Sequence, residues 1–166
     1  HEWGHNYGLH HSSLWKTTDG SVDGEAATVD EYGDPFDIMG HGPTPEGHFR
    51  PEGKAYLNWL GAAEWEDINI NLTGSKTYRI YKIDDPAVTS NPRGIRVERG
   101  GNGAQNGFYW VGYRGAFSSN PRLSNGAYLT AQRPGQARSL LLDTTPDSIG
   151  GTDDSALAMG ATFSAP

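Results

Sequence analysis

The chain opens with HEWGHNYGLHH, residues 1–11, a stretch that is dense in histidine and carries a glutamate at its second position. It predicts a helix over residues 1–9 that stops at Gly8, because glycine readily adopts the left-handed conformation that ends helices. His1 and His5 are four residues apart, so on a helix both imidazoles leave the same face and can reach one ion. The spacing therefore predicts a metal site.

A third ligand and a base complete the predicted site. After the turn at Gly8, His11 can return to the same ion. Three neutral imidazoles leave one position of zinc open, which is typical of a catalytic rather than a structural site. Glu2 lies beside the histidine face, where it can take a proton from a metal-bound water and pass it to a leaving amine. The alternative is a helix that carries surface histidines by chance. His10 is expected to be a neighbour of the site rather than a ligand.

The spacing HExxHxxGxxH resembles the metzincin signature. A second metzincin element, the Met-turn, follows in YGDPFDIMG, residues 32–40. The resemblance implies that Met39 forms an apolar floor beneath the zinc ligands. With LNWLG (57–61), FYWVGYR (108–114) and LLDTTP (141–146), the chain looks like the gametolysin-type metallopeptidases. One position differs from these peptidases: Gly112 stands where an acidic residue is expected.

The resemblance also implies an α+β fold in which residues 1–65 are the C-terminal part of a metzincin catalytic domain, with the active-site helix, the Met-turn and a following helix. The upstream half of such a domain is not in the sequence, so we expect the chain to begin at a cut inside the active-site helix. A fragment that keeps every ligand and loses their scaffold is expected to be inactive.

The rest of the chain predicts short elements. Residues 12–47 are rich in Asp, Gly, Thr and Pro and are expected to form a loop, and a helix is expected over 51–60, with Pro51 at its start. Residues 66–166 are predicted to be an antiparallel, β-sandwich-like domain, truncated at its C-terminus. Its expected strands are rich in β-branched and aromatic residues and are bounded by Gly, Pro and Asn. They are residues 76–83, 94–99, 107–114, 126–132 and 139–143.

Two further features carry weaker hypotheses. Several metzincins place a tyrosine two residues after the Met-turn methionine, and here that position is His41. Its imidazole could donate a hydrogen bond to the developing oxyanion, could close the resting site as a fourth ligand, or could simply be an exposed turn residue. Seven acidic residues between His11 and Met39 could hold Ca²⁺ or form a solvated loop. Asp37 among them is a candidate for fixing the backbone of the Met-turn.

Composition limits the partners. The net charge of −7 with scattered basic residues argues against nucleic acid and anionic membrane surfaces, and no apolar run is long enough to span a membrane. The absence of cysteine means that any metal is held by nitrogen and oxygen ligands. We therefore expect a secreted zinc endopeptidase that acts on a protein or peptide substrate. The alternative is a catalytically silent extracellular module that binds a polymer or mediates adhesion.

Overall fold

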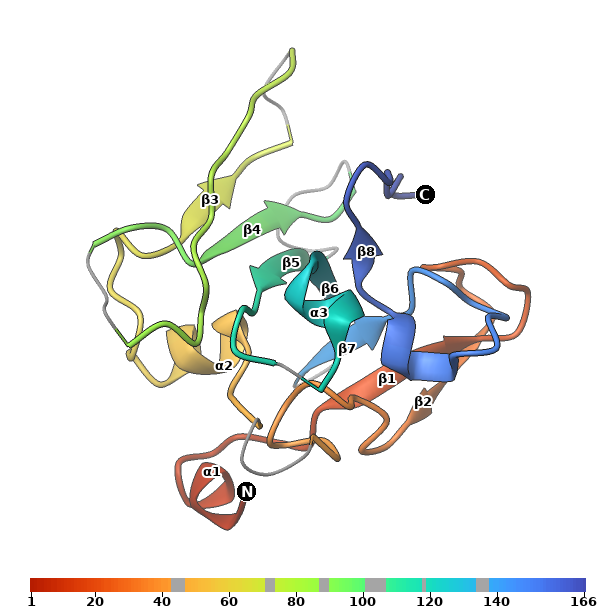
Figure 1. Ribbon diagram of the computed structural model, residues 1–166, viewed down its shortest axis with the longest axis horizontal. Coiled ribbons are helices and arrows are strands. Elements are labelled where there is room, and N and C mark those ends of the chain that lie inside the picture. Colours follow the sequence, from red (N-terminus) through yellow and green to blue (C-terminus); the bar gives the residue numbers. More distant parts are fainter. Residues whose placement is uncertain (43–46, 71–73, 87–89, 101–106, 118, 134–137) are drawn as a thin grey trace.

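A computed structural model describes the chain at residues 1–42, 47–70, 74–86, 90–100, 107–117, 119–133 and 138–166. It is a mixed α+β structure built on one 8-stranded sheet (Figure 1). The helices are α1 (Glu2–Asn6), α2 (Pro51–Tyr56) and α3 (Pro121–Ser124), with a 3-10 turn η2 (Gly151–Asp154). The strands are β1 (Ser13–Thr17), β2 (Ala27–Asp30), β3 (Glu66–Ile68), β4 (Gly94–Glu98), β5 (Phe108–Tyr113), β6 (Gly126–Gln132), β7 (Ser139–Leu142) and β8 (Leu157–Ala158).

The strand order is β2-β1-β7-β6-β5-β4-β3, and β8 pairs with the start of β6. The pairs β1–β7 and β3–β4 are parallel, whereas the other pairs are antiparallel. The expectation of an all-antiparallel, sandwich-like arrangement within residues 66–166 is therefore wrong. The sheet is a single mixed one, and it takes in two strands from the first 65 residues.

The core lies against the central strands. All four residues of β7 are buried, because both faces of this strand are covered: Leu141 belongs to one apolar cluster and Leu142 to the other. One apolar cluster joins the Met-turn region and α3 to the sheet, and a second lies against β5 and β6. Their buried members are Leu14, Phe36, Phe117, Leu123, Tyr128, Leu141 and Ala156 in the first cluster, and Tyr109, Leu129, Ala131 and Leu142 in the second.

Four of the five strands expected from composition are present, at 94–98, 108–113, 126–132 and 139–142. The fifth, over residues 76–83, is not. Tyr81 N–H donates to Pro92 O, at 2.8 Å, but proline has no N–H with which to return the bond. A second bond, from Ile83 N–H to Tyr113 O at 2.9 Å, ties the segment to the end of β5, but the two contacts form no ladder.

The segment 12–47, expected to be a loop, contains β1 and β2. Leu14 and Trp15 pair in parallel with Leu141 and Leu142 of β7, and β2 then adds to the free edge of β1. Pairing with a buried strand far along the chain overrides the weak local preference of this short, polar segment.

The two expected helices are shorter than predicted. The first spans only Glu2–Asn6, and Gly8 has the predicted left-handed backbone, with φ 87°. The second ends at Tyr56 rather than at residue 60, since Asn58 also has a positive φ, of 56°. None of the helices in the described part of the chain is long and apolar enough to cross a membrane.

Gly112 has a packing explanation. It lies opposite Tyr128 in the β5–β6 pair, and a Cβ atom there would come within 3 Å of the Tyr128 ring. A side chain at residue 112 would displace this fully buried ring, so a glycine fits opposite the tyrosine.

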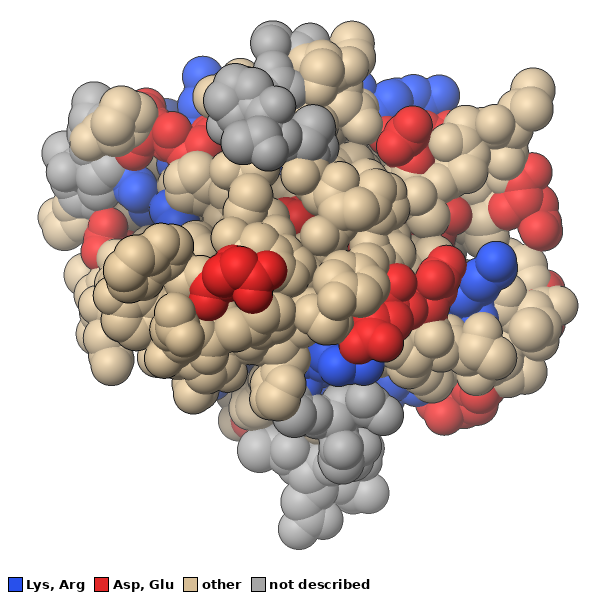
Figure 2. Space-filling view, turned by 90° about the horizontal axis from the view of Figure 1, so that it is seen from below, with Lys and Arg blue, Asp and Glu red and all other residues tan. Residues whose placement is uncertain are grey.

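On the face seen in Figure 2, lysine and arginine residues lie in small groups between acidic ones. The described residues on this face form no continuous basic surface of the kind that nucleic acid requires. Exclusion of nucleic acid as a partner stays a prediction.

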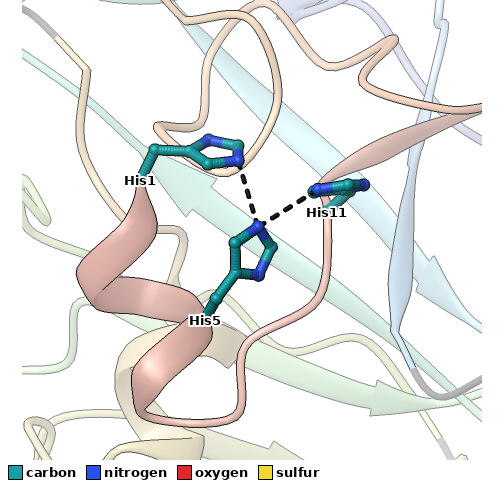
Figure 3. A group of neighbouring side chains, drawn as sticks. All are labelled: His1, His5 and His11. Atoms are coloured by element: carbon teal, nitrogen blue, oxygen red, sulfur yellow. Dashed lines mark hydrogen bonds between the residues drawn. The ribbon is translucent and has the colours of Figure 1, made fainter.

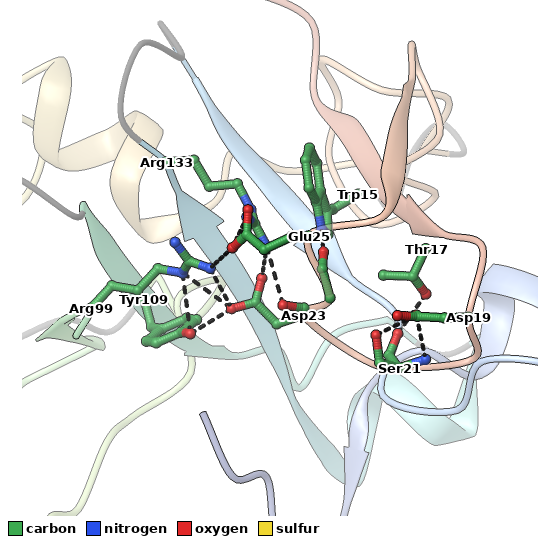
Figure 4. A network of polar contacts seen from close by, with 10 residues as sticks. Trp15, Thr17, Asp19, Ser21, Asp23, Glu25, Arg99, Tyr109 and Arg133 are labelled. Carbon is green, nitrogen blue, oxygen red and sulfur yellow. Dashed lines mark hydrogen bonds and ion pairs between the residues drawn. The ribbon is translucent and has the colours of Figure 1, made fainter. Parts of the chain in front are cut away.

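The loop between β1 and β2 is fastened to the sheet by a buried ionic network (Figure 4). The Asp23 carboxylate is fully buried, accepts a hydrogen bond from Tyr109, and pairs with Arg99 at 3.0 Å and with Arg133. Glu25 lies 3.2–3.3 Å from the same two guanidinium groups. Burial, and to a lesser extent the hydrogen bond to Asp23, raises the pKa of Tyr109 to about 12.

Asp23→Ala is expected to lower the free energy of unfolding by about 3–5 kcal/mol, because Arg99 and Arg133 lose their buried partner and, in the described part of the chain, keep only the exposed Glu25 as an acidic partner. Asp19→Ala is the control: among the described residues this exposed carboxylate of the same loop bonds Ser21, and its loss is expected to cost about 1 kcal/mol or less. Urea unfolding monitored by tryptophan fluorescence measures both. Equal losses for the two variants would show that the buried network does not stabilise the fold.

Candidate metal centre

His1 and His5 lie at the two ends of one turn at the start of the chain. Helix α1 begins after His1, and the imidazole rings of His1 and His5 approach edge to face with centroids 4.8 Å apart. The chain then reverses at Gly8, where the amide N–H donates to His5 O at 2.9 Å. This turn returns His11 to the face that carries the first two histidines, as the spacing predicted (Figure 3).

Each of the three imidazoles is held through its Nδ1 atom. His1 Nδ1 lies 2.8 Å from Ile38 O, and His5 Nδ1 lies 2.9 Å from Leu9 O. His11 Nδ1 lies 2.8 Å from a carboxylate oxygen of Glu31. Because these oxygens can only accept hydrogen bonds, Nδ1 carries the hydrogen in each ring. In the neutral imidazoles every Nε2 is left with a lone pair.

The three Nε2 atoms converge on one point (Figure 3). The Nε2 of His5 lies 3.2 Å from that of His1 and 3.1 Å from that of His11, and the three candidate ligand atoms lie within 4.8 Å of one another. Zinc–nitrogen bonds of about 2.0–2.1 Å in a tetrahedron place two nitrogens roughly 3.3 Å apart. Three lone pairs at this spacing repel one another unless a cation lies between them, so the donor set fits zinc.

The Met-turn supports this cluster from below. Met39 is 2% exposed, and its sulfur and methyl group fill the space against Gly4, where a Cβ atom would collide with them. Ser12 N–H, one residue after the third histidine, donates to Met39 O at 2.9 Å. A side chain larger than hydrogen at residue 4 would therefore push the histidine helix off this floor.

Asp37 fixes the backbone of the Met-turn, as predicted. Its carboxylate accepts from Met39 N–H at 2.6 Å and from Arg50 N–H at 2.8 Å. Arg50 in turn binds the buried Asp34 carboxylate at 2.9 Å. Burial raises the pKa of Asp34 to about 6 although Arg50 opposes the shift. The polar groups behind the Met-turn are thus paired with one another.

The two predicted catalytic side chains lie outside the group of three. Glu2 is exposed on α1 and directly follows His1. His41 is also exposed, and its Nδ1 donates to Tyr32 O at 2.5 Å. His10 is exposed and does not join the three converging rings.

The acidic residues of the 12–47 segment take several different partners. Asp23 and Glu25 bind arginines of the sheet, Asp34 and Asp37 bind Arg50, and Glu31 binds His11. In the described ranges, the three histidines form the one group of three or more potential ligands close enough to hold an ion. A calcium site stays a prediction, because no group of carboxylates in the described residues lies close enough together to hold the ion.

Two residues near the histidines were not singled out from the sequence. In the sequence Glu31 is one of seven acidic residues between His11 and Met39, and Tyr32 is the first residue of the Met-turn stretch. The Tyr32 ring lies 3.8 Å from the His11 ring and 5.9 Å from the His1 ring, measured between centroids. The hydrogen bond from His11 holds the pKa of Glu31 below its usual value. No local sequence signal marks either residue, because both reach His11 only through the pairing of β2 with β1.

A cavity of about 410 Å³ opens beside the third histidine. Its lining combines apolar and aromatic side chains with charged and polar ones, and it reaches from the loop after α1 to the sheet. Lining residues include Leu9, His11, Met39, Phe49, Trp65 and Trp110.

Comparison of the chain with protein-family models, with curated proteins and with solved structures finds no match. The site is therefore described by its own residues, three imidazoles whose candidate ligand atoms lie close together.

Proposed function

We propose that the protein is a zinc-dependent endopeptidase of the metzincin type, secreted and acting on extracellular or cell-wall proteins. The observation that carries the proposal is the convergence of the Nε2 atoms of His1, His5 and His11 while each Nδ1 donates to an oxygen. Hydrogen bonds that fix the tautomer of all three rings and turn their Nε2 lone pairs toward one another are typical of a metal site, whereas a surface cluster without a metal has no need of them. Met39 behind Gly4 supports the same assignment.

In this proposal His1, His5 and His11 hold the ion, which when bound polarises the scissile carbonyl and activates water. Glu2 takes a proton from the attacking water as the oxygen bonds to the carbonyl carbon. It then delivers that proton to the amide nitrogen as the carbon–nitrogen bond breaks. The open cavity beside His11 offers room for a substrate side chain next to the reacting bond.

The longest natural chain that carries residues 1–166 is expected to contain one zinc per molecule and to cleave gelatin or casein. Metal analysis gives the stoichiometry. The chelator 1,10-phenanthroline should abolish cleavage, and added zinc should restore it. Zinc binding without cleavage would favour the silent binding module, whereas cleavage that resists the chelator, or a chain that takes up no zinc, would refute the proposal.

A further inference from the structure

The end of β2 brings a short turn against the third histidine. Asp30 is the last residue of β2 and pairs with Leu14 of β1, and β1 begins two residues after His11. The segment that follows β2 therefore runs alongside the segment that precedes β1. This register places Glu31 within 2.8 Å of His11 Nδ1.

Tyr32 occupies this turn in an uncommon backbone conformation. Its φ of 62° lies in the left-handed region, which is unfavourable for a residue with a side chain. Such conformations persist where the surroundings determine them. Here Gly33 N–H donates to Asp30 O at 3.0 Å, and His41 Nδ1 donates to Tyr32 O at 2.5 Å.

The strained turn directs the tyrosine ring toward the histidines. The planes of the Tyr32 and His11 rings are inclined by 33°, and those of Tyr32 and His1 by 22°. With 41% of its surface exposed, Tyr32 also shields the outer side of His11 from solvent without being part of the core. Packing in the core does not account for the unfavourable backbone conformation of Tyr32. Contact with the two candidate ligands does.

We propose that Glu31 and Tyr32 are positioning residues for the metal ligand His11: Glu31 fixes the tautomer and the orientation of its ring, Tyr32 packs on the face of that ring, and His41 anchors the turn that carries both. The inference rests on the proposed zinc site and extends it. Of the three candidate ligands, His11 is the only one whose Nδ1 acceptor is a side chain in the described structure; those of His1 and His5 are backbone oxygens. His11 is thus the candidate ligand whose Nδ1 acceptor can be removed by a side-chain substitution.

The experiment measures the zinc dissociation constant of the full natural chain by competition with a chromophoric chelator. Loss of a partner that orients a ligand typically weakens metal binding by about 10–100-fold, and this is expected for Glu31→Ala. Glu31→Gln keeps an oxygen that accepts from Nδ1 and should stay within about tenfold of the wild type. Asp30→Ala removes the same charge one residue earlier and should bind zinc like the wild type. Tyr32→Ala should weaken binding, and Tyr32→Phe, which keeps the ring, should restore it.

Cobalt-substituted protein gives a second readout, because the visible absorption of bound Co²⁺ reports the geometry of its ligands. Glu31→Ala should shift these bands, whereas Asp30→Ala should leave them unchanged. Glu31 is largely exposed, with 57% of its side chain accessible, so these variants should fold, which circular dichroism checks. Wild-type affinity and an unshifted cobalt spectrum in Glu31→Ala would overturn the inference while leaving the zinc site standing. A wild-type chain that binds no zinc would overturn both.

Discussion

Replacement of Glu2 by glutamine is expected to lower turnover by about 10²–10⁴-fold, the usual contribution of a positioned general base, while the protein keeps its zinc. The structure explains why the two effects separate. The three imidazoles are oriented by Ile38, Leu9 and Glu31, so none of them depends on Glu2. Glutamine has the shape of the native side chain but cannot take the proton of the attacking water.

The measurement pairs peptide hydrolysis with metal analysis on the same preparation of full-length protein. Asn6→Ala, another exposed polar position of α1, is the matched control and should keep both activity and zinc. Near-normal hydrolysis by Glu2→Gln would assign the base to another group, and loss of zinc together with activity would make Glu2 a structural residue.

Removal of the central histidine is expected to have the largest effect on metal binding. His5 Nε2 faces both other nitrogens, at 3.2 Å from His1 and 3.1 Å from His11, so His5→Ala leaves a gap between the remaining two. Zinc sites with four ligands release about 10–16 kcal/mol on binding. If that energy is shared about equally, one lost ligand weakens affinity on the order of 10²–10³-fold. Hydrolysis should disappear with the metal.

His10→Ala provides the control for this change, because it removes an exposed imidazole next to the third ligand and leaves the converging group intact. Zinc affinity is measured by chelator competition for both variants. Equal affinities in His5→Ala and His10→Ala would mean that zinc binds elsewhere.

The candidate site is largely predictable from the sequence because its information is local. His1 and His5 are related by the pitch of a helix, and a glycine with a positive φ returns the chain to place His11. These relations hold whatever the rest of the molecule does. Met39 was implied by the family resemblance alone, and the structure places it against Gly4.

The parts that escaped prediction depend on distant pairing. Residues 13–17 become a strand because β7 offers them a buried partner, and nothing in their own composition specifies that contact. Glu31 meets His11 only because β2 then pairs with β1 in the register that sets Leu14 opposite Asp30. A shift of one residue in that register would send Glu31 to the opposite face. Residues 76–83 have the composition of a strand, but a proline opposite them removes the donor that a ladder needs.

The parallel pairing of β1 with β7 also has a consequence in time. Residue 13 can pair in the sheet only after residue 140 has been synthesised. Because ribosomes add about 5–20 residues per second, the partner of β1 is made roughly ten seconds after β1 itself. Contacts this far apart along the chain also form slowly, because a long loop must close before they can be made. His1 and His5 can adopt their helical spacing early, but the support beneath His11 comes late. The proposed third ligand, His11, therefore acquires the sheet that supports it only after most of residues 1–166 have been synthesised.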